Sequence, residues 1–150
     1  MYQTIYFDMD GTLANLYGVR DWLPKLRAED PSPYMDACPM LRLSQLARQL
    51  NALQRQGYHI GIISWLSKES TRAYDVEVTI AKTEWLKAHM PSVTWDEIHI
   101  VPHGVPKSEA AHIQPFDILF DDEQKNLDEW EQAGGWGFFP DEIFEILRGL

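Results

Sequence analysis

The chain has 150 residues, of which 45% are hydrophobic, so it is long enough to form one domain with a buried core. Its net charge of −10 at pH 7 argues against a broad nucleic-acid-binding surface, although a local basic pocket is compatible with it. The sequence contains no apolar run long enough to cross a bilayer, no signal-peptide pattern, and one cysteine, Cys38, which cannot form an internal disulfide. We therefore expect a cytoplasmic, single-domain protein spanning residues 1–150, whose oligomeric state the sequence leaves open.

Strand-like and helix-like stretches alternate along the chain. In chain order they are strand 3–7, helix 41–56, strand 58–63, helix 71–89, strand 97–101, strand 116–120, helix 123–133, strand 135–139 and a short C-terminal helix. Strands separated by helices predict an α/β fold, with a mainly parallel sheet of about five strands and helices on both faces. Among the larger apolar residues, those expected in the core are Ile80, Trp85, Leu86, Trp95, Trp130 and Trp136.

Residues 13–40 interrupt this alternation. The segment holds four prolines, a mixed-charge stretch and the aromatic residues Tyr17, Trp22 and Tyr34. Loops of this length in compact domains are usually functional or disordered. We predict a small cap insertion that arches over the strand ends, and the alternative is an ordinary surface connection. Trp22 and Tyr34 could stack on a base or another flat leaving group, or could pack the cap onto the core.

Two carboxylates, Asp8 and Asp10, directly follow the first strand and precede Gly11. A strand's period of two directs both side chains to the same side of the strand exit. Like charges held this close repel, so the pair favours a cation, a shared proton or a reaction that uses both groups. The pair therefore predicts the start of a magnesium-dependent phosphoryl-transfer site.

Other polar residues follow the later strands. Ser64 ends the second strand, Lys107 lies in the loop after the third, and Asp121 and Asp122 end the fourth. In open α/β sheets, ligands bind beyond the carboxyl ends of the strands. We therefore expect a hydroxyl, a cation and a second carboxylate pair to join the first pair in one site.

This ordered set resembles the motifs of the haloacid dehalogenase-like (HAD) hydrolase superfamily, whose members are mostly phosphatases. Asp8-Met9-Asp10-Gly11-Thr12 matches its first motif, Ser64 the second, Lys107 the third and Asp121-Asp122 the fourth. The resemblance implies a Rossmann-like core. Within the superfamily the chain is most similar to the 5'(3')-deoxyribonucleotidase group, which also has a helix like Thr83-Glu84-Trp85-Leu86-Lys87 before the lysine loop.

The expected reaction is hydrolysis of a small phosphate monoester, such as a nucleoside monophosphate. Asp8 can attack phosphorus to form an aspartyl-phosphate, which divides one difficult displacement into two easier steps. Asp10 can protonate the leaving alcohol and then accept a proton from the attacking water, so a raised pKa is expected. The residues expected to bind the phosphoryl group are Ser64, Trp65, Lys107, Gly11 and Thr12.

The expected cofactor is Mg²⁺, which prefers oxygen ligands and retained waters. The metal-binding candidates are the Asp8 carboxylate, the Asp10 backbone carbonyl and the Asp121-Asp122 pair. The family resemblance favours Asp122 as the direct ligand and Asp121 as a ligand through water or an orienting group.

Two other classes of protein stay open. A phospho-accepting receiver domain also combines acidic residues, a hydroxyl and a lysine, but its acceptor Asp follows the third strand, and no Asp directly follows 97–101 here. A non-catalytic phosphate-binding module would have no need of an acid/base at Asp10. We expect the partner to be a small phosphorylated metabolite, not a nucleic acid or a membrane.

Overall fold

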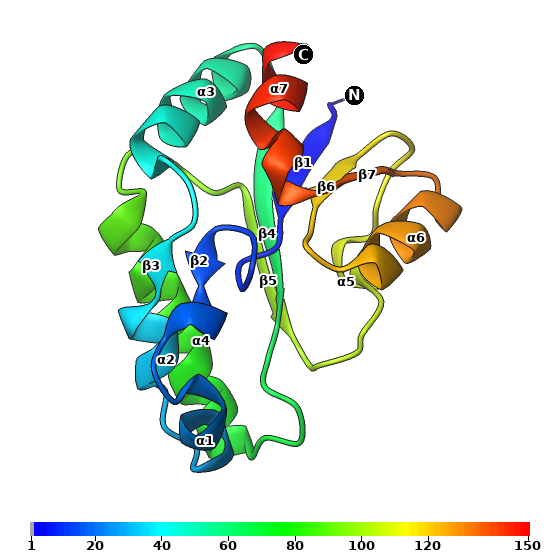
Figure 1. Cartoon of the computed structure of the whole chain (residues 1–150). Helices are drawn as coiled ribbons and strands as arrows, with labels where there is room; N and C mark the ends of the chain where they lie inside the picture. The colour runs from blue at the N-terminus through cyan, green and yellow to red at the C-terminus, as the bar shows by residue number, and fades with distance from the viewer. Residues whose placement is uncertain (1) are drawn as a thin grey trace.

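The computed structural model describes residues 2–150 and has an open parallel sheet at its centre (Figure 1). Its strands are β1 (Thr4–Phe7), β4 (His59–Trp65), β5 (Glu97–Val101), β6 (Ile118–Phe120) and β7 (Trp136–Phe138). They lie in the order β5-β4-β1-β6-β7, and every neighbouring pair is parallel. The α/β class and the five-stranded parallel sheet predicted from the sequence are confirmed.

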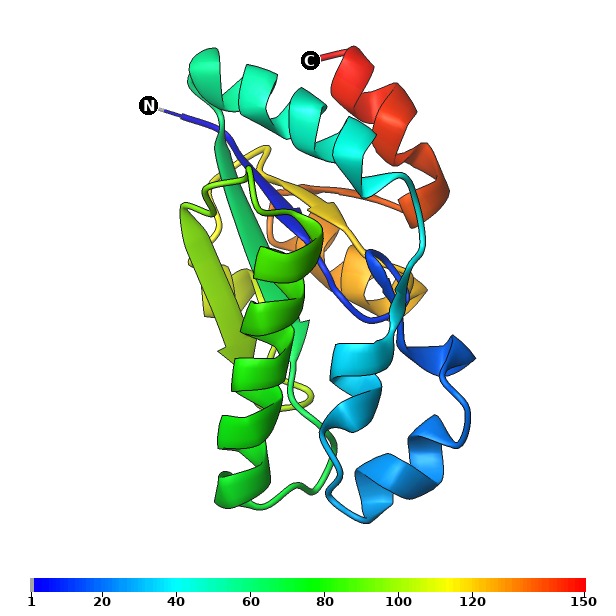
Figure 2. The same ribbon diagram turned by 90° about the vertical axis from the view of Figure 1, so that its left-hand side faces the viewer.

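Helices cover both faces of this sheet because its strands are apolar on both sides. The helices on one face are α3 (Leu43–Arg55), α4 (Arg72–His89) and α7 (Ile143–Arg148), the last following the short 3₁₀ helix η2 (Pro140–Glu142). The opposite face carries α5 (Lys107–Ala111) and α6 (Gln124–Gln132). Along β1, Ile5 and Phe7 pack toward the first group, whereas Tyr6 between them packs toward the second. The two views of the ribbon show this layering (Figures 1 and 2).

The insertion at residues 13–40 folds into short elements beside α4 (Figure 2). These are β2 (Ala14–Asn15), the 3₁₀ helix η1 (Leu16–Gly18), α1 (Trp22–Arg27), α2 (Ser32–Asp36) and β3 (Cys38–Pro39), with β2 and β3 antiparallel. Tyr34 packs with Tyr74 and Val78 of α4 in a separate apolar cluster. The Glu29 carboxylate accepts hydrogen bonds from the backbone N–H of Thr71 at 3.0 Å and from its hydroxyl at 2.9 Å. The insertion is therefore joined to the first half of α4 by apolar packing and hydrogen bonds.

Several local expectations were wrong. Ile80 is 57% exposed because the buried face of α4 follows Val78, Ala81 and Trp85, and Ile80 lies out of phase with it. Trp136 is 46% exposed because it begins the edge strand β7, where its ring packs against Phe116 at 5.2 Å.

Two boundaries near the motifs also differ from expectation. Strand β4 continues to Trp65, so Ser64 lies within the strand instead of ending it. Lys107 begins helix α5 instead of lying in a loop. Within residues 2–150, none of the helices combines the length and the apolarity needed to cross a membrane.

Candidate active site

A cavity of about 480 Å³ lies at the carboxyl ends of the strands. Its wall includes the strand-end residues Asp8, Asp10, Trp65, Asp121 and Asp122, together with Lys107 at the start of α5. The insertion contributes Leu16, Tyr17, Trp22, Leu23, Leu26, Arg27 and Tyr34. The strand-end residues are mostly charged and those of the insertion mostly apolar, so the cavity has a polar floor and a largely apolar side.

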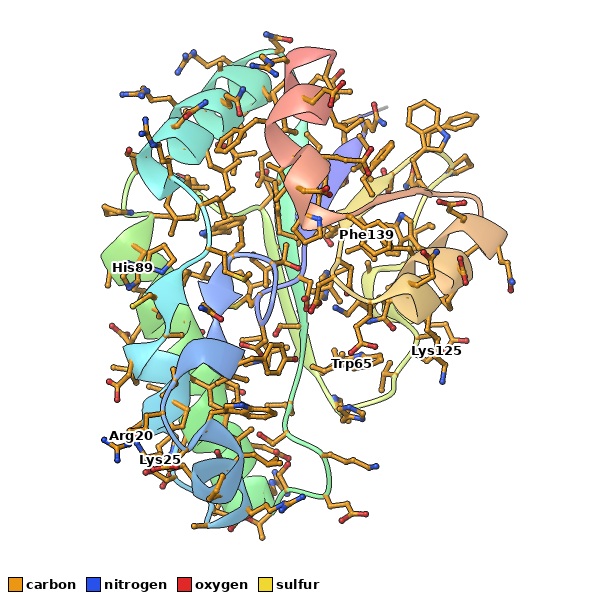
Figure 3. All side chains as sticks on the ribbon, viewed as in Figure 1. Arg20, Lys25, Trp65, His89, Lys125 and Phe139 are labelled. Carbon is orange, nitrogen blue, oxygen red and sulfur yellow. The ribbon has the colours of Figure 1, made fainter. Side chains whose placement is uncertain are left out.

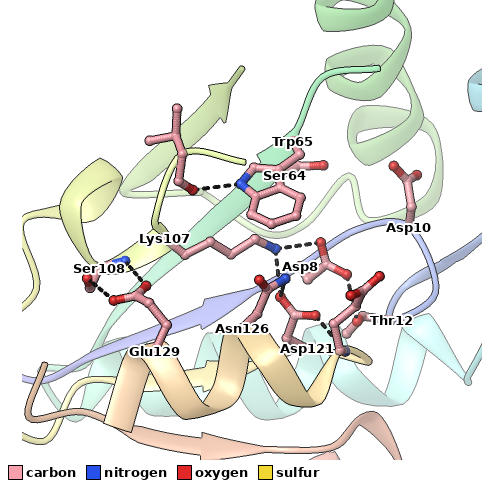
Figure 4. A network of polar contacts seen from close by, with 12 residues as sticks. Asp8, Asp10, Thr12, Ser64, Trp65, Lys107, Ser108, Asp121, Asn126 and Glu129 are labelled. Carbon is pink, nitrogen blue, oxygen red and sulfur yellow. Dashed lines mark hydrogen bonds and ion pairs between the residues drawn. The ribbon is translucent and has the colours of Figure 1, made fainter. Parts of the chain in front are cut away.

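Lys107 lies between two carboxylates at the floor of this cavity. Its Nζ donates to Asp8 Oδ1 at 2.8 Å and to Asp121 Oδ2 at 2.7 Å, and its side chain is 2% exposed (Figure 4). Burial by itself would lower the pKa of Lys107, but the two carboxylates outweigh it and raise that pKa above its ordinary value. Lys107 is therefore a fixed positive charge at neutral pH.

Residues of helix α6 and of its N-cap hold Lys107 and Asp121 in place through hydrogen bonds. The backbone N–H of Ser108, next to Lys107, donates to Glu129 at 3.1 Å, which holds the start of α5 against α6. Asn126 donates to Asp121 Oδ2 at 3.1 Å, and the backbone N–H of Glu123 donates to Asp121 Oδ1 at 2.9 Å. Both oxygens of Asp121 therefore already have protein donors.

Three carboxylates, Asp8, Asp121 and Asp122, bring one oxygen each to within 4.8 Å of one another. Burial together with the neighbouring charge of Asp8 raises the pKa of Asp121 to about 6 and the pKa of Asp122 to about 8. An all-oxygen donor set of this kind suits a hard divalent cation such as Mg²⁺. The residues present therefore fit the metal that the sequence predicts.

Gly11 and Thr12 shape the site from the loop after β1. Gly11 has φ +85°, and a Cβ at this position would lie 2.1 Å from Asp122 Oδ2, so only glycine lets the Asp122 carboxylate approach. The Thr12 hydroxyl donates to Asp8 Oδ2 at 3.0 Å. With Lys107 on Oδ1, both oxygens of Asp8 are held, which fixes the orientation of its carboxylate.

Asp10 binds a different lysine, which the sequence analysis did not identify. Lys82 of α4 donates from Nζ to Asp10 Oδ2 at 2.9 Å and to Ser64 Oγ at 2.6 Å. Figure 4 shows Asp10 apart from the group formed by Asp8 and Lys107. Both Asp side chains line the cavity at the strand exit, as expected, but they bind different lysines.

Burial raises the pKa of Asp10, the Lys82 ammonium opposes this shift, and the Asp8 carboxylate adds to it. The net direction is upward, as a group that must carry a proton in one step requires. Ser64 is fully buried behind the cavity wall and reaches the site through Lys82.

Trp65 lies between the insertion and the α5 side of the molecule, where Figure 3 labels it. Its indole N–H donates to the Val105 carbonyl at 2.8 Å, and its ring lies 5.5 Å from Lys107 Nζ and 4.8 Å from the His103 ring. The side chain of Trp65 is thus a wall of the cavity beside the lysine.

No known family model and no curated protein matches this sequence. Solved structures share its fold. D,D-heptose 1,7-bisphosphate phosphatase from B. bronchiseptica, solved with magnesium and phosphate, matches with a TM-score of 0.59 at 12% identity, over 96% of this chain and 86% of that one. The enzyme of the same name from Burkholderia thailandensis matches with a TM-score of 0.55 at 12% identity, over 89% and 74%. An uncharacterised protein from Corynebacterium glutamicum matches with a TM-score of 0.52 at 17% identity, over 100% and 97%. The fold is therefore the Rossmann-like core implied by the sequence resemblance, and phosphatases are among the proteins that share it.

The raised pKa values predict how stability changes with pH in the metal-free protein. In the unfolded chain Asp121 and Asp122 lose their protons near pH ~4, whereas in the folded protein they keep them to about pH 6 and 8. Between these limits the unfolded state binds fewer protons, so the free energy of unfolding falls as pH rises. We expect the Tm to fall from about pH 4 to about pH 8, by roughly 2–4 °C for each kcal/mol lost.

Asp122→Asn is the matched control, because it removes one of the two crowded carboxylates and leaves the rest of the chain unchanged. The pH-dependent fall in Tm should be smaller in this variant. Excess Mg²⁺ should raise the wild-type Tm more at pH 8 than at pH 5, since the metal offsets the same repulsion. If metal-free wild type and Asp122→Asn showed the same dependence of Tm on pH, that result would contradict the crowding of these carboxylates.

The close approach at Gly11 predicts a second effect on stability. Gly11→Ala should lower the free energy of unfolding by more than Gly134→Ala, measured by denaturant titration. Gly134 also has a positive φ, +101°, but among the described residues no heavy atom lies within 4 Å of its Cβ position. The control therefore carries only the backbone cost, about 1–2 kcal/mol. Gly11→Ala should also weaken Mg²⁺ binding, and equal losses in the two variants would show that the contact with Asp122 is unimportant.

Proposed function

We propose that this protein is a magnesium-dependent phosphatase of the HAD-like superfamily, which hydrolyses a small phosphate monoester through an aspartyl-phosphate on Asp8. The observation that carries the proposal is the Asp8 carboxylate, held by Lys107 and Thr12 inside an acidic cluster at the floor of the cavity. A fold shared with phosphatases supports it. A buried carboxylate oriented by two donors is preorganised for attack on phosphorus.

The metal would be held by carboxylate oxygens of Asp8 and Asp122 and by the backbone carbonyl of Asp10. We assign Asp121 an indirect role, because its oxygens accept three hydrogen bonds, from Lys107, Asn126 and the Glu123 backbone. The Asp8 oxygens accept only one each, so each keeps a lone pair for phosphorus or the metal. When bound, Mg²⁺ supplies positive charge against the phosphoryl oxygens and orients the ester.

The residues of the chain then divide the reaction between them. Asp8 forms the bond to phosphorus while the bond to the leaving oxygen breaks. Asp10 gives its proton to that oxygen. In the second step Asp10 takes a proton from the water that attacks phosphorus, while the Asp8–phosphorus bond breaks and inorganic phosphate leaves. Lys107 offsets the negative charge that accumulates between the phosphoryl group and Asp8. Binding of the phosphoryl group by Ser64, Trp65, Gly11 and Thr12 stays a prediction.

The aromatic lining of the cavity favours a substrate whose leaving group has a flat or apolar part. Tyr17 and Trp22 of the insertion pack edge to face at 4.9 Å, and both line the cavity together with the carboxylates. We infer that residues 13–40 act as the cap, and that a nucleoside monophosphate is a substrate to test first, as in a 5'-nucleotidase. Sugar phosphates come second, because two phosphatases of this fold act on a heptose bisphosphate.

The strand order argues against the receiver alternative. When the five strands of the sheet are numbered 1 to 5 in chain order, their spatial order across the sheet is 3-2-1-4-5. Receiver domains have the doubly wound order 2-1-3-4-5. A binding module without catalysis would keep this fold but not the need for a second, acid/base carboxylate at Asp10.

Release of inorganic phosphate from a panel of esters, with and without Mg²⁺, tests the proposal. The panel includes nucleoside 5'- and 3'-monophosphates, sugar phosphates and p-nitrophenyl phosphate. Asp8→Asn should abolish turnover. Asp10→Asn should slow it by about 10²–10⁴-fold while Mg²⁺ binding stays largely intact. Unchanged turnover in Asp8→Asn would refute the nucleophile, and a long-lived phosphoprotein without ester turnover would favour a receiver-like role.

The two acidic neighbours should differ in metal binding. Asp122→Asn should weaken Mg²⁺ binding more than Asp121→Asn does, measured by calorimetry on the folded variants, because only Asp122 is assigned as a direct ligand. Asp121→Asn should instead lower the Tm by more, since it leaves Lys107 buried with one carboxylate fewer. The reverse order of Mg²⁺ affinities would exchange the two roles.

A further inference from the structure

Lys82 is a buried lysine in the middle of α4, with its side chain 1% exposed. Its Nζ donates to three acceptors: Asp10 Oδ2 at 2.9 Å, Ser64 Oγ at 2.6 Å and the Trp65 carbonyl at 2.7 Å. An ammonium group has three N–H donors, so every one of them is used. The position of this charge is therefore fixed by its surroundings.

The three acceptors come from two separate parts of the chain. Ser64 and Trp65 belong to the end of β4, which is locked into the sheet by pairing with β5. Asp10 belongs to the loop after β1. Two N–H groups thus anchor the ammonium to a rigid strand, and the third holds a carboxylate that lies beyond the end of its own strand.

The insertion covers the same lysine. The ring of Tyr34 lies 4.9 Å from Lys82 Nζ, a distance suited to a cation–π contact, and its hydroxyl is hydrogen-bonded to Ser67. Tyr34 is itself only 4% exposed. The ammonium is thereby shielded from water, which strengthens its attraction for Asp10.

One oxygen of Asp10 stays available. Oδ2 accepts from Lys82, whereas the structure shows no protein hydrogen bond to Oδ1 from any of residues 2–150. Asp10 also lines the cavity and is 16% exposed. The carboxylate is therefore held by one oxygen and can present the other to a bound ester.

We propose that Lys82 is a positioning residue, which holds the carboxylate of Asp10 at the cavity so that its free oxygen can exchange a proton with the leaving group. The functional part of this proposal rests on the acid/base role proposed for Asp10. An apolar side chain often replaces a buried ion pair without loss of stability. A role in function is therefore a better account of this buried lysine than stability alone.

The first arm of the test needs no activity. Crystal structures of wild type and Lys82→Met should show the Asp10 carboxylate displaced in the variant, while the contacts of Asp8 with Lys107 persist. Lys87→Met is the matched control, because it removes the same charge from an exposed site on the same helix, where the lysine is 69% exposed. An Asp10 carboxylate that keeps its place without Lys82 would overturn the proposal, whether or not the protein is a phosphatase.

The second arm measures kcat/KM for two esters whose leaving groups differ in their need for a proton. Lys82→Met should lower kcat/KM for glycerol 2-phosphate by about 10²-fold, the scale of a ~1 Å misplacement. The loss for p-nitrophenyl phosphate should be less than about tenfold, since p-nitrophenolate leaves without protonation. Lys87→Met should change neither. If Lys82 had a purely structural role, its loss would lower kcat/KM for both esters by the same factor. That result would refute the positioning role.

A double variant covers the case in which Lys82→Met does not fold. Lys82→Met with Asp10→Asn removes both buried charges, so it should melt above either single variant. Because Lys82 acts through Asp10, the double variant should hydrolyse glycerol 2-phosphate within about threefold of Asp10→Asn. A further large loss would show that Lys82 acts elsewhere. If wild type hydrolyses no ester, the proposed function fails. The position of the side chain at residue 10, compared between the double variant and Asp10→Asn, still decides whether Lys82 holds it.

Discussion

Four acidic side chains lie at one edge of the parallel sheet, and the site depends on how their mutual repulsion is compensated. Asp8, Asp10, Asp121 and Asp122 all line the same cavity, and burial makes their mutual repulsion strong. Two buried lysines compensate this charge. Lys107 binds Asp8 and Asp121, and Lys82 binds Asp10. The remaining crowding, at Asp8, Asp121 and Asp122, is where a divalent cation fits.

The two lysines come from opposite faces of the sheet, and the alternation of strand β4 explains how both reach one site. Ser64 is on the face that carries α4 and accepts from Lys82, whereas the next residue, Trp65, packs its ring beside Lys107 of α5. The sheet therefore separates the site into two halves. One half holds the proposed nucleophile and the carboxylates assigned to the metal, and the other holds the side chain of Asp10, the proposed acid/base.

The insertion connects the half of the site that holds Asp10 with the cavity. Tyr34 covers Lys82, while Tyr17 and Trp22 from the same insertion form the apolar side of the cavity. Packing of Tyr34 against Tyr74 and Val78 fixes the insertion on α4, the helix that carries Lys82. The apolar side of the cavity and the placement of Asp10 thus depend on the same packing of the insertion on α4. This connection suits an enzyme in which the leaving group lies against the insertion while its oxygen lies near Asp10.

The sequence alone was enough to predict the α/β class, the parallel sheet and the gathering of Asp8, Lys107 and Asp121 at its edge, because each follows an apolar run and parallel strands end together. It could not reveal Lys82, since a lysine in a helix of mixed charge is usually solvated, and Asp10 lies 72 residues away. Only the tertiary structure decided which face of α4 is buried, which left Ile80 exposed and enclosed Lys82. Local pattern determines where a strand ends, whereas the partner of a buried charge depends on how distant elements pack.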